Sequence, residues 1–203
     1  ADQELTSRKV KFLLDTPQQD GGQWDMVVSL FEKYGVVPKS VYPESISSSD
    51  SRELNQILNK LLRQDAQILR ELRVEGAESA ELQAKKEELL QEVFNFLAMN
   101  LGLPPRKFDF SYRDKDNHFH SESGLTPLTF YQKYVDLKLA DYVSIINAPT
   151  ADKPYGRSYT VEMLGNVVGS KPVRYLNVEM DRLKELAIAQ MQAGETVWFG
   201  SDV

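Results

Sequence analysis

The stretch that decides the fold lies at residues 20–26 and reads Asp-Gly-Gly-Gln-Trp-Asp-Met. Directly after its two glycines, apolar residues recur with the 3.6-residue period of one helix face, at Trp24, Val27, Val28 and Phe31. Gly35 and Pro38 then predict the helix end, with Gly35 as a left-handed C-cap. Because glycine lacks a Cβ, an extended peptide could approach Gly21 and Gly22 closely and form main-chain hydrogen bonds with them. A tight loop with dihedral angles that other residues avoid explains the pair equally well.

Residues 51–101 predict a helical hairpin. They contain no proline, tryptophan or tyrosine and one glycine, Gly76, within a turn at 75–79. Two apolar stripes follow the helical period: Leu54, Ile57, Leu58, Leu61, Ile68, Leu69 and Leu72 in one, and Leu82, Leu89, Val93, Phe96 and Leu97 in the other. Asp50 and Glu53 are the expected capping pair at the start, and Gly102 the expected end. We expect the stripes to pack on each other and on the body of the protein; the alternative is a partner-binding coiled coil.

Residues 103–203 change to short strands mixed with helices. The expected strands are Phe108–Tyr112, His118–His120, Tyr142–Ile146, Tyr159–Glu162, Val173–Val178 and Thr196–Phe199. The expected helices run from Thr126-Pro127 to Tyr134 and over Asp181–Ala193. The predicted class is therefore α+β, in three stretches: 1–50, 51–102 and 103–203.

The amino-acid composition argues against several classes of function. The 203 residues carry 24 basic and 30 acidic side chains, a net charge of −6, and no cysteine. The acidity argues against a nucleic-acid partner, and no cysteine nucleophile or thiolate zinc site lies within these residues. No apolar run reaches the roughly 18 residues of a membrane-spanning helix, so the expected compartment is the cytoplasm. The start at Ala1 and the end just after an apolar run lead us to expect a piece of a longer protein.

Two patterns could carry chemistry of their own. His118 and His120 stand two apart, so on a strand both imidazoles would face one ion, with oxygens from Asp114 and Asp116 nearby. The simpler interpretation is an exposed hairpin whose histidines face water, so no metal site is expected. Residues 165–169 (Gly-Asn-Val-Val-Gly) lack the core of a phosphate loop and predict a turn or bulge. No cofactor is expected, and no carboxylate pair stands out as catalytic.

Several segments together resemble aminopeptidase C and bleomycin hydrolase, a family of papain-like cysteine peptidases. They occur in family order across nearly the whole chain: 20–26, 32–40, 43–45, 125–128, 130–131, 159–162, 164–169 and 197–200. The resemblance implies a partial papain-like cysteine-proteinase fold with an inserted helical hairpin. It also implies a cytosolic thiol aminopeptidase acting on peptide N-termini.

The same resemblance places the catalytic residues outside this chain. In the family, the oxyanion glutamine and the nucleophilic cysteine lie upstream of residues 20–26, and the histidine and asparagine lie downstream of 197–200. The piece alone is therefore expected to be inactive, with a helical self-association module as the alternative function. Ser201 stands where the family pattern has cysteine, but that cysteine is not the nucleophile.

The resemblance also implies a substrate-binding surface within this chain. It implies that Gly21 and Gly22 bind the substrate main chain and that Gln23 and Trp24 edge a side-chain pocket, which Gly200 also faces. The implied partners are a peptide substrate, the rest of the enzyme and further copies of the chain, assembled as a homohexamer in the family.

Overall fold

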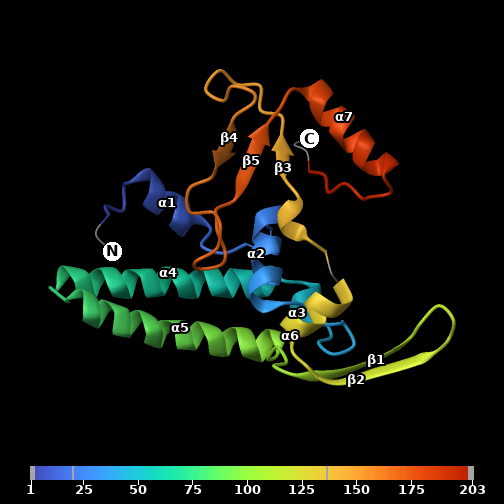
Figure 1. Ribbon diagram of the computed structural model, residues 1–203. Helices are drawn as coiled ribbons and strands as arrows, with labels where there is room; N and C mark the ends of the chain where they lie inside the picture. Colours follow the sequence, from blue (N-terminus) through green and yellow to red (C-terminus); the bar gives the residue numbers. More distant parts are fainter. Residues whose placement is uncertain (1–2, 20, 136, 201–203) are drawn as a thin grey trace. The chain divides into compact units, whose positions relative to one another are not determined.

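The computed structural model describes residues 3–19, 21–135 and 137–200 (Figure 1). The chain forms two compact units: unit 1 comprises Ala1–Gly22 and Val37–Pro127, and unit 2 comprises Gln23–Val36 and Leu128–Val203. The chain thus passes from one unit to the other three times. These units are defined by contacts, so the expected division of the sequence at residues 50 and 102 stays a prediction.

Unit 1 is built on the predicted helical hairpin, which is confirmed. Helices α4 (Arg52–Val74) and α5 (Ser79–Leu101) run side by side in Figure 1, and Gly76 makes the turn with a φ of 99°. Buried side chains from both helices form the core, with further apolar residues packed against them: Leu54, Leu58 and Val93, with Leu61, Leu62, Phe96, Leu97 and Leu101. None of the described helices is both long enough and apolar enough to cross a membrane.

The hairpin differs from expectation at its start. Ser51, not Asp50, is the N-cap of α4. Asp50 instead ends a short helix, α3 (Ile46–Ser49), and its carboxylate accepts a hydrogen bond of 2.8 Å from Nε of Arg52. The predicted capping pair of Asp50 and Glu53 is therefore wrong, because α4 begins one residue later than expected, with Ser51 as its N-cap, and the Asp50 carboxylate bonds to Arg52 instead.

The N-terminal segment of unit 1 is attached to the hairpin by polar side chains. Arg63 of α4 donates to the carbonyls of Leu14 and Asp15, at the end of helix α1 (Arg8–Asp15), which was not predicted. The side chain of Asn59 accepts from and donates to the backbone of Gln18, at 2.8 and 2.9 Å. These hydrogen bonds join residues more than 40 positions apart. Because they leave no apolar period in the sequence, they could not be predicted from it.

A two-stranded antiparallel ribbon completes unit 1. It consists of β1 (Phe108–Arg113) and β2 (Phe119–Leu125), with Arg113 opposite Phe119 and an irregularity between Phe108 and Phe110. The return strand predicted at His118–His120 is thus present, but it begins one residue later and extends to Leu125.

Unit 2 contains a small mixed sheet and the predicted helix that begins at Trp24. Its three strands are β3 (Ser144–Ile146), β4 (Ser158–Thr160) and β5 (Arg174–Asn177), in the order β3-β5-β4 with β3 parallel and β4 antiparallel to β5. The helices are α2 (Trp24–Tyr34), α6 (Pro127–Phe130, whose first residue still belongs to unit 1), a π-helical turn at Tyr131–Val135, a 3₁₀ turn at Leu139–Asp141 and α7 (Met180–Gln192). Gly35 ends α2 with a φ of 75°, as expected, but with an extended ψ of −161° in place of the left-handed helical value.

The strand predicted at Thr196–Phe199 is wrong. Residues 195–200 have no regular secondary structure, and the side chains of Trp198 and Phe199 are 71% and 82% exposed. A strand needs a neighbouring strand to satisfy its backbone groups, and no described strand pairs with this segment.

A buried asparagine organises the loop between β3 and β4. Asn177, at the end of β5, is 0% exposed. Its amide group donates to the carbonyls of Ala148 and Lys153 at 3.1 and 2.7 Å, and its Oδ1 accepts from the N–H of Ala148 at 2.9 Å. Because a buried amide must be hydrogen-bonded to offset its lost hydration, Asn177 fixes the path of this loop.

A buried carboxyl lies in the helical hairpin. Asp65 of α4 is 8% exposed. Burial, and to a smaller extent the negative charge of Glu92 in α5, raises the pKa of Asp65. The folded protein therefore holds this proton more tightly than the unfolded chain does, so the group favours folding most at low pH and less as the pH rises.

We predict that Asp65→Asn raises the thermal unfolding temperature at pH 7, because the amide is never ionised. The difference from the unsubstituted protein should vanish as the pH falls below the unfolded pKa of about 3.9. Thermal unfolding followed by circular dichroism between pH 3 and 8 measures this. Glu195→Gln removes an exposed carboxylate and serves as the control; an equal shift in both variants would contradict the prediction.

Candidate functional site

The start of α2 displays two of the predicted substrate-binding residues. Gln23 is the N-cap, with extended backbone angles of −113° and 159°, and its side chain is exposed. Trp24 is the first helical residue and is half-buried, with its indole Nε1 buried and without a hydrogen-bond partner in the described part of the chain. The first turn of α2 therefore combines an accessible amide side chain with an apolar ring.

Trp24 lies in an aromatic cluster drawn from distant parts of unit 2. Its ring contacts that of Trp198 edge-on, with centroids 5.0 Å apart, and that of Tyr142 at 5.5 Å. Segment 197–200 therefore lies beside the start of α2. Gly200, predicted to face the same pocket as Trp24, follows two residues after Trp198 and is exposed.

The two glycines directly precede Gln23 and belong to unit 1. Both are exposed, neither has a φ in the left-handed range, and a Cβ added to either would meet no described atom within 4 Å. The tight-loop explanation for Gly21 and Gly22 is therefore not supported, since neither backbone strain nor crowding requires glycine there. Their role as substrate binders stays a prediction, as do the roles of Gln23, Trp24 and Gly200.

Helix α2 is fixed against the second part of unit 2 by polar contacts. The carboxylate of Asp25 accepts the backbone N–H of Arg174 in β5 at 3.1 Å, and Nζ of Lys33 donates to the carbonyl of Val168 at 3.0 Å. Burial and the charge of Asp25 raise the pKa of Tyr175 in β5. The loop at 165–169 is a turn, as predicted, with Gly169 at a φ of 82°.

Two cavities lie beside helix α2, and both are lined by residues of unit 2. One, of about 350 Å³, lies between α2 and residues 160–173; the other, of about 240 Å³, lies between α2, residues 139–144 and strand β5. Asp25 and Ser29 line both cavities, whereas Gln23, Trp24 and Gly200 line neither. Gln23, Trp24 and Gly200 therefore lie outside the lining of both of these cavities.

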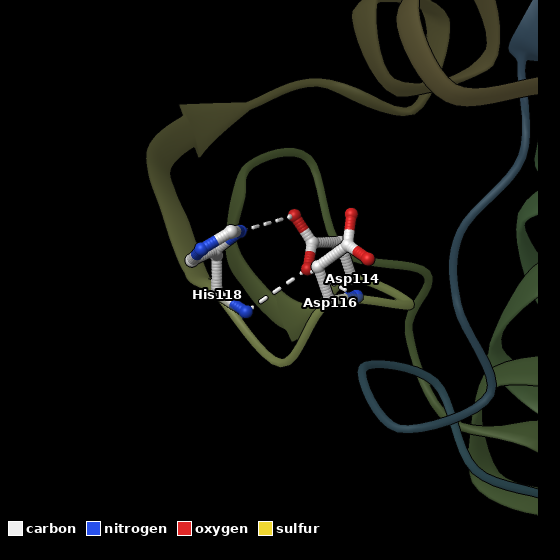
Figure 2. Close-up of side chains that lie close together, drawn as sticks. All are labelled: Asp114, Asp116 and His118. Carbon is white, nitrogen blue, oxygen red and sulfur yellow. Dashed lines mark hydrogen bonds and ion pairs between the residues drawn. The ribbon is translucent and has the colours of Figure 1, made fainter.

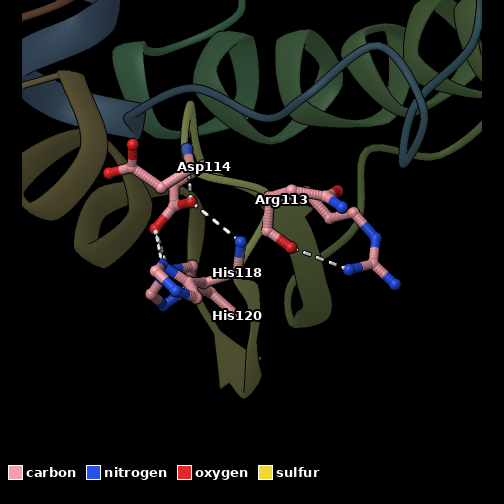
Figure 3. A network of polar contacts seen from close by, with 6 residues as sticks. Arg113, Asp114, His118 and His120 are labelled. Atoms are coloured by element: carbon pink, nitrogen blue, oxygen red, sulfur yellow. Dashed lines mark hydrogen bonds and ion pairs between the residues drawn. The ribbon is translucent and has the colours of Figure 1, made fainter.

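A second polar cluster lies in unit 1, at the turn between β1 and β2. One ligand atom each of Asp114, Asp116 and His118 lie within 4.8 Å of one another (Figure 2). Oδ2 of Asp114 is also 2.9 Å from Nε2 of His120 and 3.4 Å from Nδ1 of His118 (Figure 3). The hydrogen bond from His120, followed by that from the His118 backbone, lowers the pKa of Asp114. The histidines are exposed, as expected, but they do not simply face water, because both are directed at one carboxylate.

Comparison with known proteins identifies the family. Residues 1–203 match the family described as Peptidase C1-like. The chain belongs to the Peptidase C1-like family. It is 79% identical to aminopeptidase C of Streptococcus thermophilus and 55% identical to aminopeptidase C of Listeria monocytogenes, covering 100% of this chain and 46% and 45% of the relatives. Its structure matches the crystal structure of PepW from Lactobacillus rhamnosis HN001 with a TM-score of 0.96 and 61% identity, over 100% of this chain and 45% of PepW.

These matches confirm the resemblance found in the sequence. The fold is α+β and corresponds to part of a papain-like peptidase, with the helical hairpin inserted. The homologues support a peptidase function, and the chain spans less than half the length of those relatives. Asp20, the first residue of segment 20–26, and Ser201, which follows segment 197–200, lie outside the described residues.

The contact between the two tryptophans, which are the only two in the chain, predicts a spectroscopic change. In Trp198→Ala, Trp24 is the sole tryptophan, and loss of the covering ring should shift its emission to longer wavelength and increase its quenching by acrylamide. The reference is Trp198→Phe, which keeps an aromatic ring over Trp24. Identical emission and quenching of Trp24 in the two variants would show that residue 198 does not cover it.

Proposed function

We propose that this chain is part of a cysteine aminopeptidase that hydrolyses N-terminal residues from peptides, and that it supplies the substrate edge rather than the nucleophile. The observation that carries the proposal is the 79% identity to aminopeptidase C over the whole of this chain. Further copies of the chain, assembled as a hexamer, and the remaining part of the enzyme are the proposed partners, in the cytoplasm.

The amino-acid composition agrees with the proposal that the nucleophile lies outside these 203 residues. Papain-like catalysis needs a thiolate activated by an imidazole, and a third group that orients the imidazole. The chain has no cysteine and only two histidines. Both histidines pair with Asp114 at the turn of the ribbon. The reacting groups are therefore proposed to come from polypeptide outside these 203 residues.

The peptide substrate would bind as an extended strand along exposed backbone of this chain. An extended peptide can form main-chain hydrogen bonds with an exposed stretch of backbone, and side chains beside that stretch then select the substrate. Gly21 and Gly22 offer exposed backbone with open space around each Cα. Within unit 2, Trp24 and Trp198 offer the apolar surface of two rings in contact. We propose that this surface contacts a substrate side chain while the glycines hold its main chain.

The isolated 203-residue chain is predicted to be inactive. It should show no turnover of an aminoacyl fluorogenic substrate, because it carries no thiol. Turnover should appear when the remaining part of the enzyme is supplied, and a thiol-alkylating reagent should abolish it. Thiol-sensitive activity of the pure chain alone would overturn the proposed division of labour.

In the complete enzyme, we predict that Gly22→Ala raises KM about tenfold, or about 1.4 kcal/mol of binding free energy, because a Cβ would face the incoming peptide. The melting temperature should not change, since that Cβ meets no described atom. Gly165→Ala is the matched control, because Gly165 has equally open surroundings and no left-handed φ but lies in the loop at 165–169. Equal kinetics for both variants would argue against a substrate role for Gly22.

A further inference from the structure

We propose a binding site for a divalent transition-metal ion at the turn of the β1–β2 ribbon, with Asp114, Asp116, His118 and His120 as its ligands. These four residues alternate along the chain, and they include both of its histidines. The proposal is independent of the peptidase function, because the site lies in a ribbon that contains none of the proposed substrate residues.

The backbone of the turn brings the four residues together. The N–H of Asp114 donates to the carbonyl of His118 at 3.1 Å, and the N–H of Asn117 donates to the carbonyl of Asp114 at 3.0 Å. Asn117 adopts a φ of 66°, a left-handed conformation that asparagine tolerates better than most residues. The turn therefore closes with Asp114 and His118 facing each other, and Figure 2 shows their side chains gathered on the turn.

Contacts around the ligands fix their orientation. Oδ1 of Asp114 accepts the backbone N–H groups of Asp116 and His118, both at 2.9 Å, which leaves Oδ2 directed at the imidazoles. Tyr112, opposite His120 in the ribbon, stacks on its ring with centroids 4.9 Å apart and planes 17° apart. Such outer contacts are what orient metal ligands in proteins and raise their affinity.

The ligand atoms lie close to the separations found around one small ion. Tetrahedral zinc with bonds of about 2.0–2.2 Å places its ligand atoms about 3.3–3.6 Å apart. From Oδ2 of Asp114, Nδ1 of His118 is 3.4 Å away, within this range. Nε2 of His120 is 2.9 Å away, a hydrogen-bond distance that must lengthen by about 0.4 Å when an ion replaces the proton between the two atoms. Ligand atoms of Asp114, Asp116 and His118 lie within 4.8 Å of one another, so the exposed carboxylate of Asp116 can complete the site by rotating its side chain.

The ligand types and charges select the kind of ion. Two imidazole nitrogens with carboxylate oxygens favour zinc, copper, nickel or cobalt over magnesium and calcium, which prefer oxygen alone. Arg113, the nearest arginine in sequence, donates to the carbonyl of Asn117 at 2.9 Å and lies over the ring of Phe119, directed away from the imidazoles in Figure 3. Its positive charge is thus kept off the ligand side.

A bound ion would stabilise the ribbon. The sheet of β1 and β2 has two strands, and a ribbon of this kind is only marginally stable by itself. An ion that joins Asp114, before the turn, to His120, in the return strand, would hold the two strands in register. Binding to the folded state alone must raise its stability.

The test uses the whole chain without a histidine tag. Cobalt absorbance and zinc calorimetry should show one ion per chain, with no binding of magnesium, and zinc should slow amide hydrogen exchange in residues 108–125. Since the chain has two histidines and no cysteine, a cobalt band typical of nitrogen ligands reports on these two residues. The His118→Ala/His120→Ala variant should bind zinc at least about 100-fold more weakly, consistent with losing two ligands.

Asp114→Asn is the sharper variant. Its amide oxygen can still accept the two N–H groups that shape the turn, but the atom facing the imidazoles becomes an NH₂ group, so zinc affinity should fall at least about tenfold. Asp152→Asn removes another exposed carboxylate and should bind zinc like the unsubstituted chain. Should hydrogen exchange show an unfolded ribbon in Asp114→Asn, His120→Gln replaces it. Absence of zinc binding at millimolar concentration, or equal affinity in the double histidine variant, overturns the proposal.

Discussion

One hydrogen bond connects the earliest element of unit 2 with its sheet: the carboxylate of Asp25 accepts the N–H of Arg174, 149 positions further along the chain. Through this bond, and that of Lys33 to Val168, helix α2 is held against residues synthesised much later. The position of Trp24, one residue before Asp25, follows from this attachment. The aromatic cluster, the two flanking cavities and the edge proposed to receive a peptide therefore all depend on how firmly α2 is held.

The regular elements with a strong apolar period could be predicted from the sequence. The helical hairpin, α2, α7 and the three short strands of unit 2 were expected near their observed bounds, because each buries one face or carries a clear start or stop residue. Helices α1 and α3 were missed. They are stabilised by serine caps and by hydrogen bonds from Arg63 to the end of α1, and such long-range polar contacts leave no periodic trace.

At residues 196–199 the reverse occurred, because a strand was predicted that the structure does not contain. The Thr-Val-Trp-Phe run at 196–199 has high strand propensity, but propensity is a weak guide when no neighbouring strand offers hydrogen bonds. In the structure this segment contributes a ring, that of Trp198, to the surroundings of Trp24. For the candidate site, the sequence supplied the residue types, whereas the proximity of residues 24, 142 and 198 required the folded chain. The same holds for the ribbon, since the two histidines converge on Asp114 only because Asn117 reverses the backbone.

The order of the elements along the chain has a consequence for biosynthesis. Helix α2 ends at Tyr34, and its binding partner β5 begins at Arg174. At a ribosomal rate of about 5–20 residues per second, roughly 7–28 s pass between the emergence of these two elements. During that interval residues 37–127 of unit 1 are made, while the apolar face of α2 lacks strand β5 to cover it. A nascent chain of this kind offers chaperones a defined early target, and a translational pause before residue 174 would prolong that exposure.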